Sequence, residues 1–449
     1  MRWLVLAPVA AAMAALSGIT AARAAPPLPV FPLHADPTDR YLLDSNDVPF
    51  LMVGDAPQAL IGNLSKHLAD VFMTNREKYG INALWINLLC DSYTACNSDG
   101  TTFDGIAPFT KPGDLSTPNP AYFDRAADMI RLAAAHNMVV LLDPAETGGW
   151  LGTLESNGVN KARAYGRFLG SRFKNMPNII WLNGNDFQDW SDPAADAVVT
   201  AVAKGIRDTD PGHMQTIELN YYVSDSLDDP EWRNIVGIDA VYTYRPTYAQ
   251  EETGYRRAHF KPTFLVEANY EFEHNGGTDG GSTPNLRHQE YWTMLSGTTG
   301  QLYASHWTWT LQGAWRQNLD TPGVQQLRYM WRAFHDHAWY HLIPDLQGNV
   351  LMGGRGHHST TDSIDTDTYA TAAGTPDGKL FMAYMPSTRT FEIDMSRLAG
   401  PVTAQWYDPT NGTYRSAGSS LNNKGIRNFA PPGTNSAGDG DWLLVLTAQ

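Results

Sequence analysis

Two carboxylates are the residues best placed to do chemistry, because each closes a short apolar run. Asp186 ends the run 179–186 and Glu267 ends the run 262–267. A carboxyl group is costly to bury without a partner or a role. Two that face each other across a cleft can divide the work, one donating a proton to a leaving oxygen and the other attacking carbon. Taken singly, Asp186 could instead cap the next helix and Glu267 could belong to a buried ion pair.

Eight apolar runs, each ending near a polar or aromatic residue, supply the strands that would position these groups. They are residues 50–55, 81–87, 138–143, 178–183, 214–220, 236–242, 263–267 and 301–307. Helix-like stretches such as 119–136 and 192–208 lie between them. Alternating strands and helices predict a parallel sheet, and eight units favour a closed (β/α)₈ TIM barrel.

The carboxyl ends of the strands form the active face of such a barrel. Asp186 and Glu267 then follow strands four and seven and face each other across the mouth. Retaining glycosidases hold two carboxyl groups about 5–5.5 Å apart, which is the chemistry that this pair predicts. Any one of the other strand-end residues could be a turn or cap, but together they form the predicted substrate-binding set. That set is Asp55, Asn87, Asp143, Asn185, Asn220, Tyr242, Tyr270, Trp307 and Trp309.

The pattern changes near residue 345, where short alternating runs separated by turn signals replace the strand–helix units. Examples are residues 380–384, 390–393, 403–406 and 442–446. This texture predicts a small antiparallel β-sandwich. We therefore divide the chain into a signal peptide at 1–24, a barrel at 25–344 and a β domain at 345–449.

The N-terminus is typical of a secretory signal. Arg2 precedes an apolar stretch over residues 3–15, and Ala22-Arg23-Ala24 is a small-x-small cleavage site. The pattern predicts export to the periplasm or outside the cell, with an uncleaved membrane anchor as the alternative. In an oxidising compartment Cys90 and Cys96 are expected to form a disulfide, whereas in a reducing one they would be free thiols.

The composition limits the classes of molecule that the protein is expected to bind. A net charge of −15 without a basic stripe argues against nucleic acid, and no second segment is apolar enough to span a membrane. The 14 Trp and 20 Tyr residues suit stacking on sugar rings. His337 and His341 have the i,i+4 spacing that zinc ligands can use, but no Glu lies between them as in metalloproteases, and residues 357–367 lack the spacing and Gly of a calcium loop, so we expect no metal and no cofactor. Nothing in the sequence indicates an oligomeric state.

The order of several short motifs resembles the apiosidase-like glycoside hydrolases. These motifs are Gly54-Asp55, Tyr79-Gly80-Ile81-Asn82, residues 181–186, residues 262–267 with Tyr270-Glu271, Arg287, Tyr291, residues 297–300 with Tyr303 and Trp307, and residues 406–412. The resemblance implies a retaining barrel enzyme with Asp186 as acid/base, Glu267 as nucleophile and Asn185 on a sugar hydroxyl. It also implies a following β domain of the kind labelled collagen-binding.

One stretch departs from the family. Its members often continue Gly-Asp with a small residue, Ala and Trp, whereas this chain has Ala56-Pro57-Gln58. The resemblance therefore does not imply that the sugar is apiose. The favoured substrate is a side chain of a plant or microbial polysaccharide. Another retaining activity, such as an arabinofuranosidase or an endo-β-glycanase, is an alternative. A non-catalytic carbohydrate- or matrix-binding protein on a barrel scaffold is an alternative of another class.

Overall fold

Eight parallel strands form the centre of the first domain in the computed structural model, which describes residues 28–448. In chain order they are β4 (Met52–Asp55), β5 (Ala83–Asn87), β6 (Val139–Asp143), β7 (Ile179–Phe187), β8 (Gln215–Leu219), β10 (Asp239–Thr243), β11 (Thr263–Glu267) and β12 (Gly300–Tyr303). Each falls within or overlaps one predicted run, so the predicted barrel is confirmed. The largest differences in bounds are at the ends of two strands: β7 continues through Asp186, and β12 ends before Trp307.

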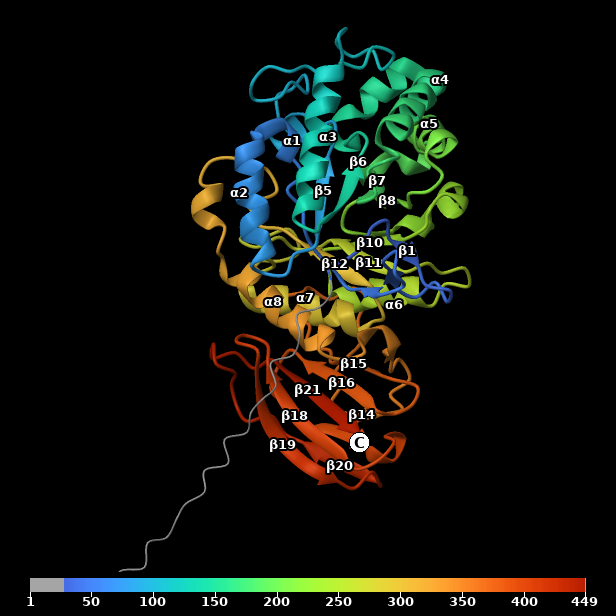
Figure 1. The fold of residues 1–449 in the computed structure, drawn as a ribbon. Helices are drawn as coiled ribbons and strands as arrows, with labels where there is room; N and C mark the ends of the chain where they lie inside the picture. The colour runs from blue at the N-terminus through green and yellow to red at the C-terminus, as the bar shows by residue number, and fades with distance from the viewer. Residues whose placement is uncertain (1–27, 449) are drawn as a thin grey trace, which may run out of the picture.

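Helices cover the outside of the barrel (Figure 1). They are α1 (Leu60–Asn63), α2 (Lys66–Glu77), α3 (Pro120–Ala135), α4 (Thr147–Phe173), α5 (Pro193–Thr209), α6 (Thr247–Tyr255), α7 (Thr283–Leu295) and α8 (Pro322–His335). Local sequence sets several starts: the side chains of Ser65, Asn119 and Asp192 accept backbone N–H groups at the N-caps of α2, α3 and α5.

The barrel departs from a strict strand–helix alternation between its fifth and sixth strands. There the chain forms β9 (Val223–Asp225), antiparallel to β10, and two 3₁₀ turns (Ser226–Asp228 and Pro230–Asn234). β8 and β9 are the two ends of the sheet. We call the gap between β8 and β10 the seam of the barrel. The Ser226 hydroxyl bridges it, since it donates to the Ile217 carbonyl at 2.6 Å and accepts the Ala240 N–H at 2.9 Å. Gly237 N–H to the Gln215 carbonyl adds a backbone bond at 2.8 Å.

A small antiparallel sheet precedes the barrel and shares its interior core. It contains β1 (His34–Ala35), β2 (Leu42–Leu43) and β3 (Pro49–Phe50). Leu42 and Phe50 belong to the same apolar cluster as the inward-facing barrel residues Trp85 and Phe264. The barrel interior is therefore a packed core and not a pore.

Two antiparallel sheets form the C-terminal domain. One contains β13 (Ile343–Pro344), β15 (Thr371–Gly374), β16 (Leu380–Met385), β21 (Trp442–Ala448), β18 (Val402–Asp408) and β19 (Thr413–Leu421). The other contains β14 (Leu351–Gly353), β17 (Phe391–Asp394) and β20 (Ile426–Phe429). Buried side chains from both, including Phe381, Phe391 and Trp406, form one core, which confirms the predicted sandwich. β13 lies before residue 345, so this sheet begins slightly earlier than the predicted boundary.

The β domain packs against α7 and α8, as Figure 1 shows. Arg287 of α7 is 1% exposed and donates to Asp441 at 2.8 Å and to Asp439 at 2.7 Å. Tyr291 of the same helix stacks on Tyr384 with ring centroids 4.7 Å apart. A buried ion pair and a stacked ring thus join the two domains.

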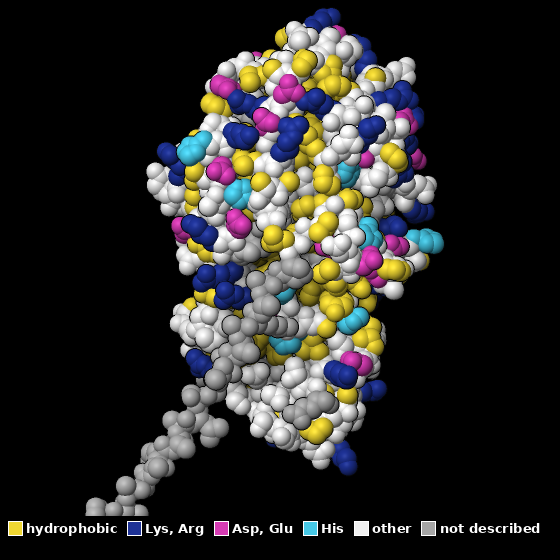
Figure 2. All heavy atoms as spheres, viewed as in Figure 1, with side chains coloured by type: hydrophobic (Ala, Val, Ile, Leu, Met, Phe, Trp, Pro, Cys, Tyr) yellow, Lys and Arg dark blue, Asp and Glu magenta, His cyan; other side chains and the backbone are white. Residues whose placement is uncertain are grey.

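The outer surface carries charges of both signs. Figure 2 shows Lys and Arg side chains interspersed with Asp and Glu on the face in view. Within residues 28–448, no helix combines the length and the apolarity that a membrane crossing requires. The predicted signal peptide lies outside the described residues.

Candidate active site

Glu267 ends β11 and is the hydrogen-bond acceptor for three tyrosines. Its Oε1 accepts the hydroxyls of Tyr242 at 3.0 Å and Tyr244 at 2.8 Å, and its Oε2 accepts that of Tyr270 at 2.5 Å. Gln58 in turn donates to the Tyr270 hydroxyl at 3.2 Å. Neutral donors, and not an ion-pair partner, therefore surround Glu267, which argues against the structural alternative for this residue.

Asp186 lies near the end of β7 in a left-handed conformation, with φ 51°. Non-glycine residues rarely adopt this conformation, and those that do cluster at functional sites. Asp192 caps α5, so Asp186 is not the cap of that helix. Instead its Oδ2 accepts the hydroxyl of Tyr93, which comes from the loop after β5. The structural alternative for Asp186 is therefore wrong.

The two carboxyl groups influence each other's protonation. Burial, followed by the charge of Asp186, raises the pKa of Glu267 to about 8, although the three tyrosine hydroxyls oppose the rise. Burial also raises the pKa of Asp186, against the hydroxyls of Tyr93 and Tyr242. Two interacting acids titrate as a pair. The protonation of each carboxyl group therefore depends on that of the other.

A third carboxyl group, Glu218 of β8, belongs to the same cluster, and the sequence analysis missed it. It has no exposed surface and accepts the Asp186 N–H at 2.9 Å and the Asn185 amide at 3.5 Å. Burial and the charges of Glu267 and Asp186 raise its pKa well above the ordinary value. A glutamate inside the apolar run Ile217–Leu219 carried the same signal as Glu267, but Asn220 appeared to end that strand.

The amides predicted to bind substrate lie beside this cluster. Asn87 donates to Asn185 at 3.4 Å and to Glu146 at 2.9 Å. Asn220 accepts the Trp190 indole N–H at 2.8 Å at the rim. Asn185 and Asn220 therefore lie at the mouth. Asn87, in contrast, has no exposed surface and its amide is bonded within the protein, to Trp85, Glu146 and Asn185, so we correct its role to support of Asn185.

The predicted aromatic residues divide into inner and outer groups. Tyr242 and Tyr270 contact Glu267, as described. Trp309 is half-buried beside Tyr270, with centroids 6.5 Å apart, and its N–H donates to Glu273 at 2.9 Å. Trp307 is half-buried in the turn after β12, against His306.

Asp55 and Asp143 do not join this group. Both have no exposed surface. Asp55 is held in an ion pair with the buried Arg76, at 2.5 Å, and Asp143 accepts the Ala145 N–H at 3.0 Å. Their position at strand ends suggested substrate binding, but their side chains point into packed structure, so we correct their role to support of the fold.

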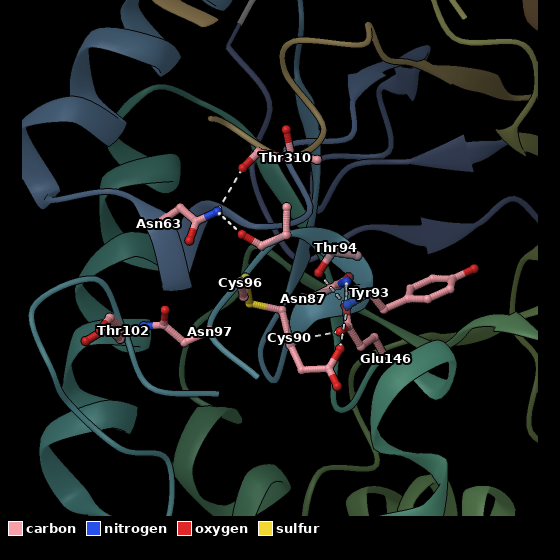
Figure 3. The surroundings of a disulfide bond; sticks show 12 residues. Asn63, Asn87, Cys90, Tyr93, Thr94, Cys96, Asn97, Thr102, Glu146 and Thr310 are labelled. Atoms are coloured by element: carbon pink, nitrogen blue, oxygen red, sulfur yellow. Dashed lines mark hydrogen bonds between the residues drawn. A yellow bond between two sulfur atoms is a disulfide. The ribbon is translucent and has the colours of Figure 1, made fainter. Parts of the chain in front are cut away.

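Cys90 and Cys96 form a disulfide that closes the loop carrying Tyr93 (Figure 3). Glu146 lies beneath the loop and accepts the Asp91 N–H and the Thr94 hydroxyl, each at 2.5 Å. Burial raises the pKa of Glu146 to about 9. No motif in this loop predicted that it reaches Asp186.

A groove of about 360 Å³ lies beside the mouth of the barrel, next to the seam between β8 and β10. Its lining includes Asn220, Tyr221, Tyr222 and Arg245. Tyr221 is 50% exposed, and the Arg245 guanidinium lies over the Tyr222 ring. In the part of the chain that the structure describes, no three His, Cys, Asp or Glu side chains are arranged to hold a metal ion.

Comparison with known families matches both domains. The family described as "Apiosidase-like, catalytic domain" matches residues 36–341, and "Putative collagen-binding domain of a collagenase" matches residues 359–447. No curated protein matches the chain.

Solved structures share the fold. One described as a glycoside hydrolase is 21% identical with a TM-score of 0.80, covering 93% of this chain and 97% of its own. A glycoside hydrolase family 5 protein from Bacteroides vulgatus is 20% identical with a TM-score of 0.80, covering 93% and 92%.

Proposed function

Because the chain belongs to the apiosidase-like family of glycoside hydrolases, we propose that it cleaves a glycosidic bond with retention at the anomeric carbon. Glu267 is the nucleophile and Asp186 the acid/base. The substrate is a side chain of a plant or microbial polysaccharide.

The observation that carries this assignment is the set of three tyrosine hydroxyls on Glu267. Hydroxyl donors stabilise a carboxylate over its protonated form. They oppose the rise in the Glu267 pKa that burial and the Asp186 charge cause, and in the proposed reaction the proton of the pair resides on Asp186 when substrate binds. A charged nucleophile opposite a protonated acid is the starting state of a double displacement.

The reaction then proceeds in two steps. Asp186 protonates the leaving oxygen while Glu267 attacks the anomeric carbon, forming a covalent glycosyl-enzyme. Asp186, now a carboxylate, takes a proton from water, and the water displaces Glu267. Asn185 is suited to bind a hydroxyl of the reacting sugar, and the groove at Tyr221 and Tyr222 offers aromatic faces to the rest of the glycan.

A panel of aryl glycosides and pectic oligosaccharides identifies the sugar. NMR of the first anomer released then tests the mechanism: retention is expected, and the inverted anomer would contradict the role of Glu267. An inverting enzyme would need a wider separation of its two carboxyl groups, about 6.5–9.5 Å, to leave room for the attacking water. No hydrolysis of any member by the wild type would favour a binding role instead.

We propose that the protein is exported after cleavage near Ala25, on the basis of the N-terminal sequence and the disulfide. N-terminal sequencing of the protein from its native cells tests this. An intact Met1 would contradict cleavage.

A further inference from the structure

We propose that the disulfide-closed loop between Cys90 and Cys96 is a positioning device for the acid/base: it holds the Tyr93 hydroxyl on Asp186 and so sets when Asp186 gives up its proton. The inference rests on the proposed role of Asp186. Tyr93 is a positioning residue in this account, because it acts through Asp186.

The loop is fixed at three places. The Cys90–Cys96 disulfide joins its ends. Glu146 accepts the Asp91 N–H and the Thr94 hydroxyl, and Figure 3 shows Glu146 close to Thr94. The Asp91 side chain also accepts the Tyr93 N–H at 2.7 Å. A ring that would otherwise rotate freely at a rim is thereby held in one direction.

Two glycines at the start of α4 leave room for this arrangement. A methyl group on Gly148 would come within 2.5 Å of the Tyr93 ring, and one on Gly149 would collide with the Asp91 carboxylate. The backbone of α4 thus packs directly against the loop. Tyr93 keeps 41% of its surface exposed, although its hydroxyl contacts Asp186.

The groups that face Asp186 determine what the hydroxyl does. Glu218 from β8 and Glu267 from β11 are acidic, and the hydroxyl of Tyr242 from β10, which donates to Glu267, also lowers the pKa of Asp186. Burial, followed by Asp186 and then by Glu267 and Glu218, raises the pKa of Tyr93 above its ordinary value, so its hydroxyl keeps its proton and remains a donor. A donor stabilises the Asp186 carboxylate, so removing it raises the pKa of Asp186.

The first test is Tyr93→Phe, which keeps the ring and removes the hydroxyl. The basic limb of the kcat/KM profile should move upward by about one pH unit, since Asp186 then holds its proton to higher pH. Gly148→Ala should move the limb in the same direction by displacing the ring. Tyr340→Phe, whose ring packs on Tyr41 in a different part of the barrel, is the matched control and should leave the profile unchanged.

The second test opens the loop with Cys90→Ser and Cys96→Ser together. This variant should shift the basic limb as Tyr93→Phe does, and combining the two should add nothing, because both act through one contact. If the serine variant does not fold, Tyr93→Phe and Gly148→Ala decide the question. An unmoved limb in Tyr93→Phe, or full additivity, would overturn the proposal.

A readout without catalysis separates this inference from the proposed function. Carboxyl ¹³C NMR follows the titration of Asp186, whose resonance is identified by its loss in Asp186→Asn. An upward shift in Tyr93→Phe supports the inference even if the wild type hydrolyses none of the glycosides. Unchanged titration in an active enzyme rejects the inference and leaves the hydrolase assignment standing.

Discussion

Glu267 bears the negative charge in the proposed reaction, so Glu267→Gln is the most direct single change. The amide keeps the shape but cannot attack carbon. Hydrolysis should fall by about 10⁴, equivalent to about 5.5 kcal/mol of transition-state stabilisation. Steady-state kinetics on an aryl glycoside measures this.

Asp186→Asn serves as the comparison for that variant. It should lose less in the first step with a good leaving group, because such a group needs little protonation. Wild-type rates in either variant would mean that other residues do the chemistry.

Glu218 offers a matched pair of substitutions, since it is a buried acid with a raised pKa that accepts the Asp186 N–H. Glu218→Gln keeps an acceptor oxygen and should stay within about threefold of wild-type kcat, whereas Glu218→Leu leaves that N–H unpaired. We expect the leucine variant to lose about 1–3 kcal/mol of stability and about 10-fold or more in kcat. Equal effects of the two, in urea unfolding and kinetics, would argue against this role.

At the scale of elements, periodicity was sufficient to predict all eight barrel strands and the sandwich, because buried parallel strands are continuous apolar runs. The strand-end rule placed Asp186 and Glu267 at the ends of β7 and β11, where the structure has them, and their catalytic roles stay a prediction. The rule was wrong for Asp55, because it takes no account of a buried ion-pair partner such as Arg76. Tyr93 could not be found at all, because its contact with Asp186 depends on the path of a loop.

The loop and the start of α4 give a pH-dependent prediction through Glu146. Its pKa in the folded protein is about 9 against an ordinary value of 4.5, so between these values the folded state binds more protons than the unfolded state. Stability attributable to this group therefore falls as pH rises through that window.

The variant Glu146→Gln cannot titrate at this position and should escape that loss. Its melting temperature relative to wild type should therefore increase from pH 5 to pH 9, as calorimetry at several pH values would show. Melting curves that stay parallel across this range would mean that Glu146 is charged in the fold.

At the scale of the whole molecule, Arg287 joins the barrel to the β domain through Asp439 and Asp441. Arg287→Ala leaves the buried Asp441 carboxylate without its ion-pair partner, so we expect the free energy of unfolding in urea to fall by about 3–5 kcal/mol. Arg131→Ala, which removes an exposed pair with Asp128, should change little. A stable Arg287→Ala protein would show that the domains do not depend on each other.

The seam at Ser226 has a consequence for how this enzyme can diverge. Between most neighbouring strands of the barrel, an inserted residue must respect a ladder of backbone bonds, but between β8 and β10 the sheet is joined by one hydroxyl and one amide. The residues between these strands also line the groove beside the mouth. Insertions and deletions in this segment can change the shape of the groove while the register of the other strands stays the same. Changes in specificity can therefore arise there at small cost to the stability of the fold.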